Sequence, residues 1–275
     1  MKKNKVCFIL DASGSMSHLT GHVIKMVNEN IDEFRKESVR LKQKTEISVI
    51  AFDYPNNIQY IYKDIDVKKA ENITYQDYRP NGSTALFDAV ATGIKGYPKI
   101  KKSLATSKED DTSYVIIAIT DGEENSSEVY DSRRGGGAKL AELFNEVQKT
   151  LRWTITFQVP YGGKRSLVAM GISADNIREW EQTERGVKEA TQYTSAGIRS
   201  YMNSRSMGET FTKNFYVQTD LSDLSTKQLK KELDDISDDY GIFTVSSDVQ
   251  VKDFVEKKTK RPYVKGKAYY QLVKT

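Results

Sequence analysis

An aspartate and two serines follow the first apolar run of the sequence, in the stretch FILDASGSMSHL at residues 8–19. They are Asp11, Ser13 and Ser15, and the intervening Gly14 permits a sharp bend of the chain. Three kinds of site use such residues in a short loop: the nucleophile of a hydrolase, a phosphate-binding turn and a metal site. The alternating spacing lets the three side chains point the same way, so we expect them to share one ligand.

Two further polar clusters accompany this one, at residues 81–84 (NGST) and 120–125 (TDGEEN). The first precedes a predicted helix and the second directly follows a predicted strand. Ligands of open α/β sheets bind at the carboxyl ends of the strands, so we expect the clusters to meet there. Together they offer two aspartates, two serines and a threonine, the hard oxygen ligands that Mg²⁺ prefers. Helix N-termini and backbone amides favour anions, so an acidic ligand from a partner is expected to complete the coordination.

Strand-like and helix-like apolar patterns alternate along the chain. Strands are predicted at residues 5–10, 46–52, 57–63, 113–120, 153–160 and 176–180. Helices are predicted at residues 20–42, from Ala85 onward, at 137–151 and at 184–205. The strand at 57–63 is expected to pair with the one before it as a hairpin, which places one antiparallel strand in the sheet. The fold class predicted is α/β, a doubly wound and mostly parallel sheet flanked by helices.

The composition indicates a soluble chain of moderate polarity, with 38% hydrophobic and 29% charged residues among 275. No apolar run approaches the roughly 20 residues of a membrane span, and the apolar run at residues 6–10 is too short for a signal peptide. The single cysteine, Cys7, suits a reducing compartment and is expected to be a small buried hydrophobe. We therefore expect a cytoplasmic protein. The net charge of +4 is weak evidence for nucleic-acid binding.

The distribution of charged residues changes near residue 207, so we divide the sequence into a domain at 1–207 and a small α+β module at 208–275. Residues 220–239 carry seven acidic side chains and three lysines, whereas 257–275 carry seven basic side chains and no acidic one. The basic end includes tyrosines, a mixture that binds single-stranded nucleic acid or forms a protected edge strand. We favour the structural interpretation.

Catalytic alternatives have weaker patterns. A serine nucleophile needs a base and an elbow such as Gly-x-Ser-x-Gly, which ASGSM lacks. His18 and His22 are expected to lie on or near the first helix. The glycines of RRGGGAKL at 133–140 lack the Gly-Lys-Ser/Thr ending of a P-loop, which favours a flexible loop. A metal-dependent hydrolase would need a base, and Glu123 and Glu124 are the conveniently placed candidates.

In their sequence and order, DASGS, GST before a helix and ITDGEEN after a strand resemble the von Willebrand factor A (VWA) domain, over roughly residues 4–207. The metal-ion-dependent adhesion site (MIDAS) of that family is Asp-x-Ser-x-Ser, then Thr, then Asp. The resemblance implies that Mg²⁺, with Mn²⁺ or Ca²⁺ as substitutes, is bound by Asp11, Ser13, Ser15, Thr84 and Asp121. It also implies that Asp88 is a structural companion of the site.

The function implied is protein–protein binding or scaffolding, in which a partner presents an Asp or Glu to the metal. The loop at 122–136 is expected to contact the partner, since loops at this edge carry recognition. Self-association is a further possibility, in which an acidic residue of one copy fills the metal site of another. Catalysis is not expected. The alternatives are a metal-dependent hydrolase, phosphatase or peptidase-like, and nucleic-acid binding by the basic C-terminal tail.

Overall fold

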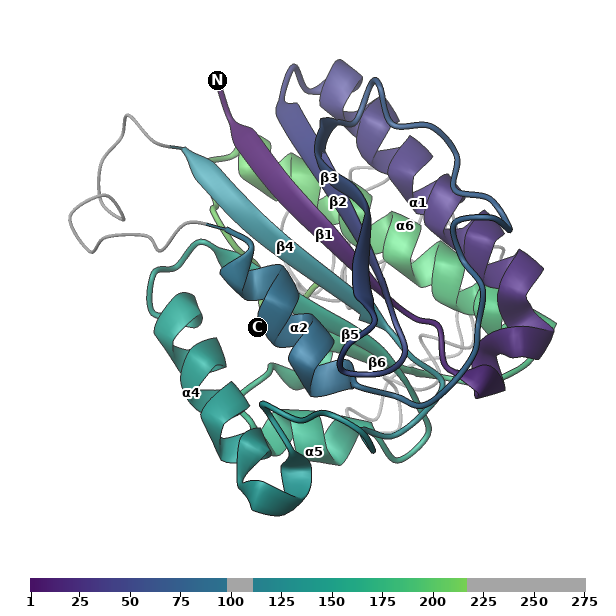
Figure 1. Cartoon of the computed structure of the whole chain (residues 1–275). Helices are drawn as coiled ribbons and strands as arrows, with labels where there is room; N and C mark the ends of the chain where they lie inside the picture. The colour runs from purple at the N-terminus through teal and green to yellow at the C-terminus, as the bar shows by residue number, and fades with distance from the viewer. Residues whose placement is uncertain (98–110, 217–275) are drawn as a thin grey trace, which may run out of the picture. The chain divides into compact units, whose positions relative to one another are not determined.

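Strands and helices alternate along the chain in the computed structural model, which describes residues 1–97 and 111–216 (Figure 1). The strands are β1 (Lys3–Asp11), β2 (Lys44–Phe52), β3 (Ile58–Asp66), β4 (Thr112–Ile119), β5 (Trp153–Pro160) and β6 (Ile177–Trp180). The helices are α1 (Thr20–Arg40), α2 (Leu86–Lys95), α4 (Gly136–Gln148), α5 (Lys164–Ala169) and α6 (Glu184–Ser206). Short 3-10 turns lie at Gly14–Leu19, Ser132–Arg134 and Ala174–Asn176.

The six strands of the described residues form one sheet in the order β3-β2-β1-β4-β5-β6. All neighbouring pairs are parallel except β2 and β3, which are antiparallel. Helices α1 and α6 cover one face of the sheet, and α2, α4 and α5 cover the other (Figure 1). The predicted fold class and the predicted antiparallel strand are both confirmed.

Strand β1 is the centre of the sheet because its apolar run is buried on both faces. Val6, Phe8 and Leu10 pack on the side of α1, and Cys7 and Ile9 pack on the side of α2. All five side chains are fully buried. A continuous apolar run is what a parallel strand covered on both faces requires. Cys7 is the small buried hydrophobe that its position predicts.

Helix α1 packs its apolar side chains at helical spacing, among them Val23, Val27, Ile31 and Phe34, against the sheet. It ends at Arg40 rather than at residue 42 because Lys42 adopts a left-handed backbone conformation, with φ of 52°. None of the helices in residues 1–97 and 111–216 has both the length and the apolar content of a membrane span.

The compact unit to which the described residues belong spans residues 1–217. The stretch 208–216, predicted to belong to the C-terminal module, packs on the rest of this unit. Phe215 is 1% exposed within its core, and the carbonyl of Thr210 accepts a hydrogen bond from Ser113 Oγ at 2.5 Å. The remainder of the predicted module, with its acidic and basic segments, lies outside the described residues.

Glu46 on β2 lies among lysines, with Oε2 2.9 Å from Lys5 Nζ and Oε1 2.8 Å from Lys44 Nζ. Partial burial alone would raise the pKa of Glu46. The hydrogen bonds from Lys44 and Lys5 outweigh this effect and lower the pKa to about 2. This value is below the ordinary 4.5, so the ionised carboxylate stabilises the fold above pH 4.5. The stabilisation is lost as the pH falls from 4.5 toward 2.

We expect Glu46→Gln to lower the free energy of unfolding by about 1 kcal/mol near neutral pH, a figure reduced for the solvent exposure of the lysines. Near the folded-state pKa of about 2 the difference between the two proteins is expected to become small. Urea denaturation near neutral pH and near pH 2 measures the free energy of unfolding of both proteins. If the two proteins differed by the same amount at both pH values, the ion pairs of Glu46 would contribute nothing to stability.

Candidate metal centre

The candidate centre lies between two adjacent strands whose following helices pack on opposite faces of the sheet. Strands β1 and β4 are adjacent and parallel, yet β1 continues to α1 on one face and β4 continues to α4 on the other. Their register pairs Leu10 with Ile119, so the ends of the two strands lie side by side. Asp11 ends β1, and Asp121 follows β4 by two residues. This is the switch point at which doubly wound sheets bind ligands.

Hydrogen bonds join the first polar cluster to the third. The backbone N–H of Ser13 donates to Asp11 Oδ1 at 2.8 Å, and the hydroxyls of Ser13 and Ser15 are 3.0 Å apart. The Ser15 hydroxyl donates to Asp121 Oδ1 at 2.7 Å. Four of the five predicted ligands therefore form one continuous group of oxygen atoms.

The second cluster reaches the same place through Thr84, which is 3% exposed. Its backbone N–H donates to Asn125 Oδ1 at 2.9 Å, and its carbonyl accepts from the N–H of Asn125 at 3.1 Å. Thr84 Oγ1 lies only 3.3 Å from the point where a Cβ on Gly122 would stand, immediately beyond Asp121. The structure thus brings together all five residues that the sequence predicts.

Both aspartates are buried, Asp11 at 0% and Asp121 at 2% exposed. Burial raises the pKa of Asp11 to about 6, against the hydrogen bonds from Thr120 and Ser13 that favour its ionised form. Burial likewise raises the pKa of Asp121. Asp121 Oδ2 is buried and has no hydrogen-bond partner in the described part of the chain. Two desolvated carboxylates, one with an oxygen lacking a donor, are an environment that a divalent cation would stabilise.

The donor set suits a hard cation. Within the described residues no three His, Cys, Asp or Glu side chains cluster in a way that could hold a metal ion. The oxygens gathered at the switch point are two carboxylates and three hydroxyls, which match the preference of Mg²⁺ for few carboxylates and neutral oxygen ligands or water. The residues present therefore fit the predicted group, and metal binding by these five residues stays a prediction.

Three residues outside the predicted set of ligands support the centre. Thr120 Oγ1 donates to Asp11 Oδ2 at 2.5 Å, and the Tyr78 hydroxyl donates to the Asp11 carbonyl at 2.5 Å. The side-chain amide of Gln182 donates to the Asp121 carbonyl. Thr120 is part of a polar cluster that the sequence marks, whereas Tyr78 and Gln182 belong to none of the three clusters and give no signal of their own.

Glu124 connects the loop after β4 to the first turn of α2. Its Oε1 accepts the backbone N–H groups of Ser126 and Ser127 at 2.9 and 2.7 Å. Its Oε2 accepts the N–H of Phe87 and the hydroxyl of Ser127 at 2.8 and 2.7 Å. Both carboxylate oxygens are thus occupied.

Asp88, in the first turn of the same helix, also binds the loop. It accepts the backbone N–H groups of Glu128, Val129 and Tyr130 at 2.8, 3.2 and 2.8 Å. This confirms the structural role expected of Asp88. Glu124 and Asp88, which we call the α2 clamp, fix Thr84 at the start of α2 relative to Asp121 at the start of the loop.

The histidines are not arranged to activate a serine. His18 Nδ1 is 2.8 Å from the carbonyl of Ser15, and Nε2 is 3.3 Å from the carbonyl of Gln182. Both ring nitrogens therefore face backbone oxygens instead of a serine hydroxyl. His22 lies on α1, 3.6 Å from Glu184.

Of the three glycines at 135–137, Gly136 is required by chain packing. A Cβ on Gly136 would stand 2.0 Å from the backbone carbonyl of Tyr130, so only glycine fits there. Asp131 caps the preceding turn by accepting the N–H of Arg133 at 2.9 Å. This close approach accounts for a glycine at the first position of α4 without a bound phosphate.

Comparisons with known proteins extend only to the fold. No protein-family model matches the chain, and no curated protein matches its sequence. The structure is similar to the pilus adhesin SpaC of Lactobacillus rhamnosus GG, at a TM-score of 0.51 and 11% identity over 74% of this chain and 30% of that one. It is also similar to a point mutant of the PilB minor pilin of Streptococcus sanguinis, at 0.50 and 12% over 76% and 63%.

A third similar structure is the proximal thread matrix protein 1 of the mussel byssus with a zinc-occupied MIDAS motif, at a TM-score of 0.45 and 14% identity over 73% of this chain and 46% of that one. This chain therefore spans between 30% and 63% of the length of these three proteins. At such low identity, the first two similarities show an α/β fold of this kind, and the third carries no argument.

Proposed function

We propose that this chain is a protein-binding domain of the VWA type, in which a divalent cation connects it to an acidic side chain of a partner. The ligands would be Asp11, Ser13, Ser15, Thr84 and Asp121, and the cation Mg²⁺, with Mn²⁺ or Ca²⁺ as substitutes. The observation that carries the proposal is the buried Asp121 Oδ2, which lacks a donor beside a continuous group of carboxylate and hydroxyl oxygens.

The cation would supply an open coordination position for the partner's carboxylate. The protein's own residues hold the ligands in place. Thr120 and the backbone of Ser13 each donate to one oxygen of Asp11, which orients that carboxylate. The Ser15 hydroxyl does the same for Asp121 Oδ1 and leaves Oδ2 unbound. Ser15 is exposed, so the centre opens to the surface where a partner would approach.

Binding is favoured over hydrolysis because the conveniently placed acids are poor candidates for a general base. Glu124 already accepts four hydrogen bonds, while Glu123 is exposed on the same loop. The neighbour SpaC is described as a pilus adhesin, which agrees with a binding role for this fold. Hydrolysis of phosphate esters in Mg²⁺ or Mn²⁺ that disappears with Asp121→Asn would overturn the choice.

We expect the full chain, immobilised on resin, to capture a protein from lysate of its source cells in Mg²⁺ and to release it in EDTA. Asp121→Asn is expected to lose capture, because the neutral amide cannot balance the charge of the cation. Without the cation, the partner's carboxylate is expected to bind this surface only weakly. Mass spectrometry of the captured fraction identifies the partner.

The matched control is Asp175→Asn, an exposed aspartate in the turn that precedes β6. It removes the same charge and is expected to leave capture unchanged. Capture that persists both in EDTA and with Asp121→Asn would refute the metal mechanism. Recovery of the chain itself in the Mg²⁺ fraction would identify a second copy as the partner.

A further inference from the structure

Tyrosine side chains are exposed at the edge of the sheet that carries the candidate metal centre. The exposed aromatic residues in the described part of the chain are Tyr54, Tyr75 and Tyr161. Tyr54 and Tyr161 follow the carboxyl ends of β2 and β5, which run parallel to β1 and β4. The Tyr75 hydroxyl lies against Gly21, in the first turn of α1. All three therefore lie at the same edge as the centre.

The Tyr54 ring packs against a segment of the centre itself. A Cβ on Gly82 would stand 2.9 Å from both Cδ2 and Cζ of the ring, so the ring lies directly on the glycine backbone. The Gly82 carbonyl accepts the backbone N–H of Gly14 at 3.0 Å. Gly14 belongs to the loop at residues 11–15, which carries three of the predicted ligands and which we call the metal loop. One residue, Gly82, thus links the ring to the metal loop.

Hydrogen bonds hold the turn that carries Tyr54 in place. The backbone N–H of Tyr54 donates to Asp53 Oδ1 at 2.5 Å, and the Tyr54 carbonyl accepts the N–H of Asn57 at 2.9 Å. The Asp53 carbonyl accepts the N–H of Ala85, the residue after the predicted ligand Thr84, at 2.9 Å. With 47% of its surface exposed, the Tyr54 side chain is both fixed and accessible, which lowers the entropy cost of contact with a partner.

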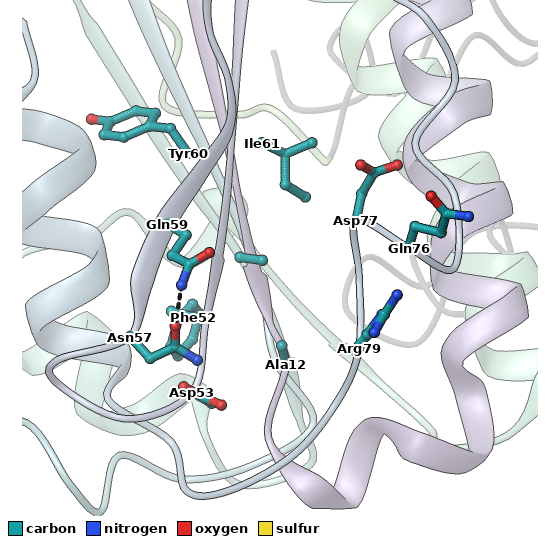
Figure 2. Close-up of a pocket in the computed structure, with 11 residues that line it drawn as sticks. Ala12, Phe52, Asp53, Asn57, Gln59, Tyr60, Ile61, Gln76, Asp77 and Arg79 are labelled. Carbon is teal, nitrogen blue, oxygen red and sulfur yellow. Dashed lines mark hydrogen bonds between the residues drawn. The ribbon is translucent and has the colours of Figure 1, made fainter.

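The turn itself is neutral. Residues 54–57 read Tyr-Pro-Asn-Asn and include no charged side chain, and the preceding Asp53 is only 5% exposed. Asp53 lines a cleft of 420 Å³ together with Ala12 of the metal loop (Figure 2). Figure 2 shows the exposed charges of this cleft, Asp77 and Arg79, on the wall across from the turn. An aromatic ring in a neutral turn fits an apolar side chain of a partner.

We propose that Tyr54 selects an aliphatic or aromatic side chain near the acidic residue that a partner presents to the metal. This inference rests on the proposed function, since it takes the partner's carboxylate to be bound at the centre. Tyrosine supplies a large contact area with few rotatable bonds and is enriched among the residues that dominate binding at protein interfaces. The recognised segment then combines an acidic residue with an apolar one, and Tyr54 contacts the apolar one.

A display library of peptides with one fixed central aspartate and random flanking residues tests the preference on the full chain in Mg²⁺. We expect aliphatic or aromatic residues to be enriched near the aspartate with the wild type but not with Tyr54→Ala. Fluorescence anisotropy of an enriched peptide should show about tenfold weaker binding to Tyr54→Ala, the equivalent of about 1.4 kcal/mol. Replacing the apolar residue of the peptide by Ala should cause a similar loss with the wild type and little further loss with Tyr54→Ala.

Isothermal titration calorimetry with Mg²⁺ alone separates contact with the partner from support of the metal loop. Tyr54→Ala is expected to bind Mg²⁺ as tightly as the wild type does, and Tyr54→Phe, which keeps the ring, should retain most of the peptide affinity. If the Mg²⁺ affinity of Tyr54→Ala fell as much as its peptide affinity, Tyr54 would only support the metal loop, and the inference would be wrong.

Leu151→Ala is the matched control, because Leu151 is 55% exposed and lies two residues before β5, at the opposite edge of the sheet. It should leave peptide binding unchanged. Three results would overturn this inference and leave the proposed function standing: Mg²⁺-dependent peptides without an apolar preference, enrichment of Lys or Arg in its place, or affinity insensitive to Tyr54→Ala. Recovery of no Mg²⁺-dependent peptide would count against both.

Discussion

Magnesium is expected to raise the Tm of the wild-type protein by about 3 to 10 °C at a concentration about 10 to 100 times its Kd, and Asp121→Asn is expected to abolish the rise. A ligand that binds only the folded state stabilises it by mass action. Asp121 supplies both Oδ1, which accepts the Ser15 hydroxyl, and the buried Oδ2, which has no donor. Replacing this carboxylate by the amide of asparagine removes the charge that would hold the cation. Differential scanning fluorimetry measures both effects.

The Tm without metal separates ligand loss from misfolding. Asp121 lies near Asp11, and both carboxylates are desolvated. Removing one of two buried like charges is not expected to destabilise the metal-free fold, so Asp121→Asn should melt at or above the wild-type temperature in EDTA. Asp175→Asn should respond to Mg²⁺ as the wild type does. An equal Mg²⁺ shift in Asp121→Asn and wild type would exclude Asp121 as a ligand.

Glu124→Ala is expected to lower the free energy of unfolding by about 2 to 4 kcal/mol, because several donors at the start of α2 and in the loop after β4 lose their acceptor. The Mg²⁺ affinity should also fall, by about tenfold, since half of the α2 clamp no longer fixes Thr84 against Asp121. Urea denaturation and isothermal titration calorimetry with Mg²⁺ measure the two effects.

Glu123→Ala is the control, since Glu123 is the exposed neighbour of Glu124 on the same loop. It should change the free energy of unfolding by less than about 0.5 kcal/mol, as surface substitutions usually do. Glu124→Gln keeps an acceptor oxygen and should recover part of both losses. If Glu124→Ala destabilised the protein but left the Mg²⁺ affinity unchanged, the clamp would be structural only and would not position the ligands.

The sequence by itself determined the order of strands and helices and the residue types of the candidate site. Continuous apolar runs and period-3.6 patterns are local, so the strand at β1 and the helix at α1 could be predicted within a few residues. Helix α5 was not predicted, because its six residues are too few to show a helical period. The spacing in DASGS is also local, since alternation alone directs three side chains to one side.

Only the tertiary structure decided which distant residues meet at this site. Tyr78 and Gln182 bind the backbone of the two aspartates from 67 and 61 residues away along the chain. Contacts of that separation leave no periodic trace in the sequence, because they depend on how loops cross above the sheet. The same holds for the α2 clamp. The sequence thus predicted which side chains could bind a cation. The parallel pairing of β1 with β4 brings two of them, Asp11 and Asp121, close together.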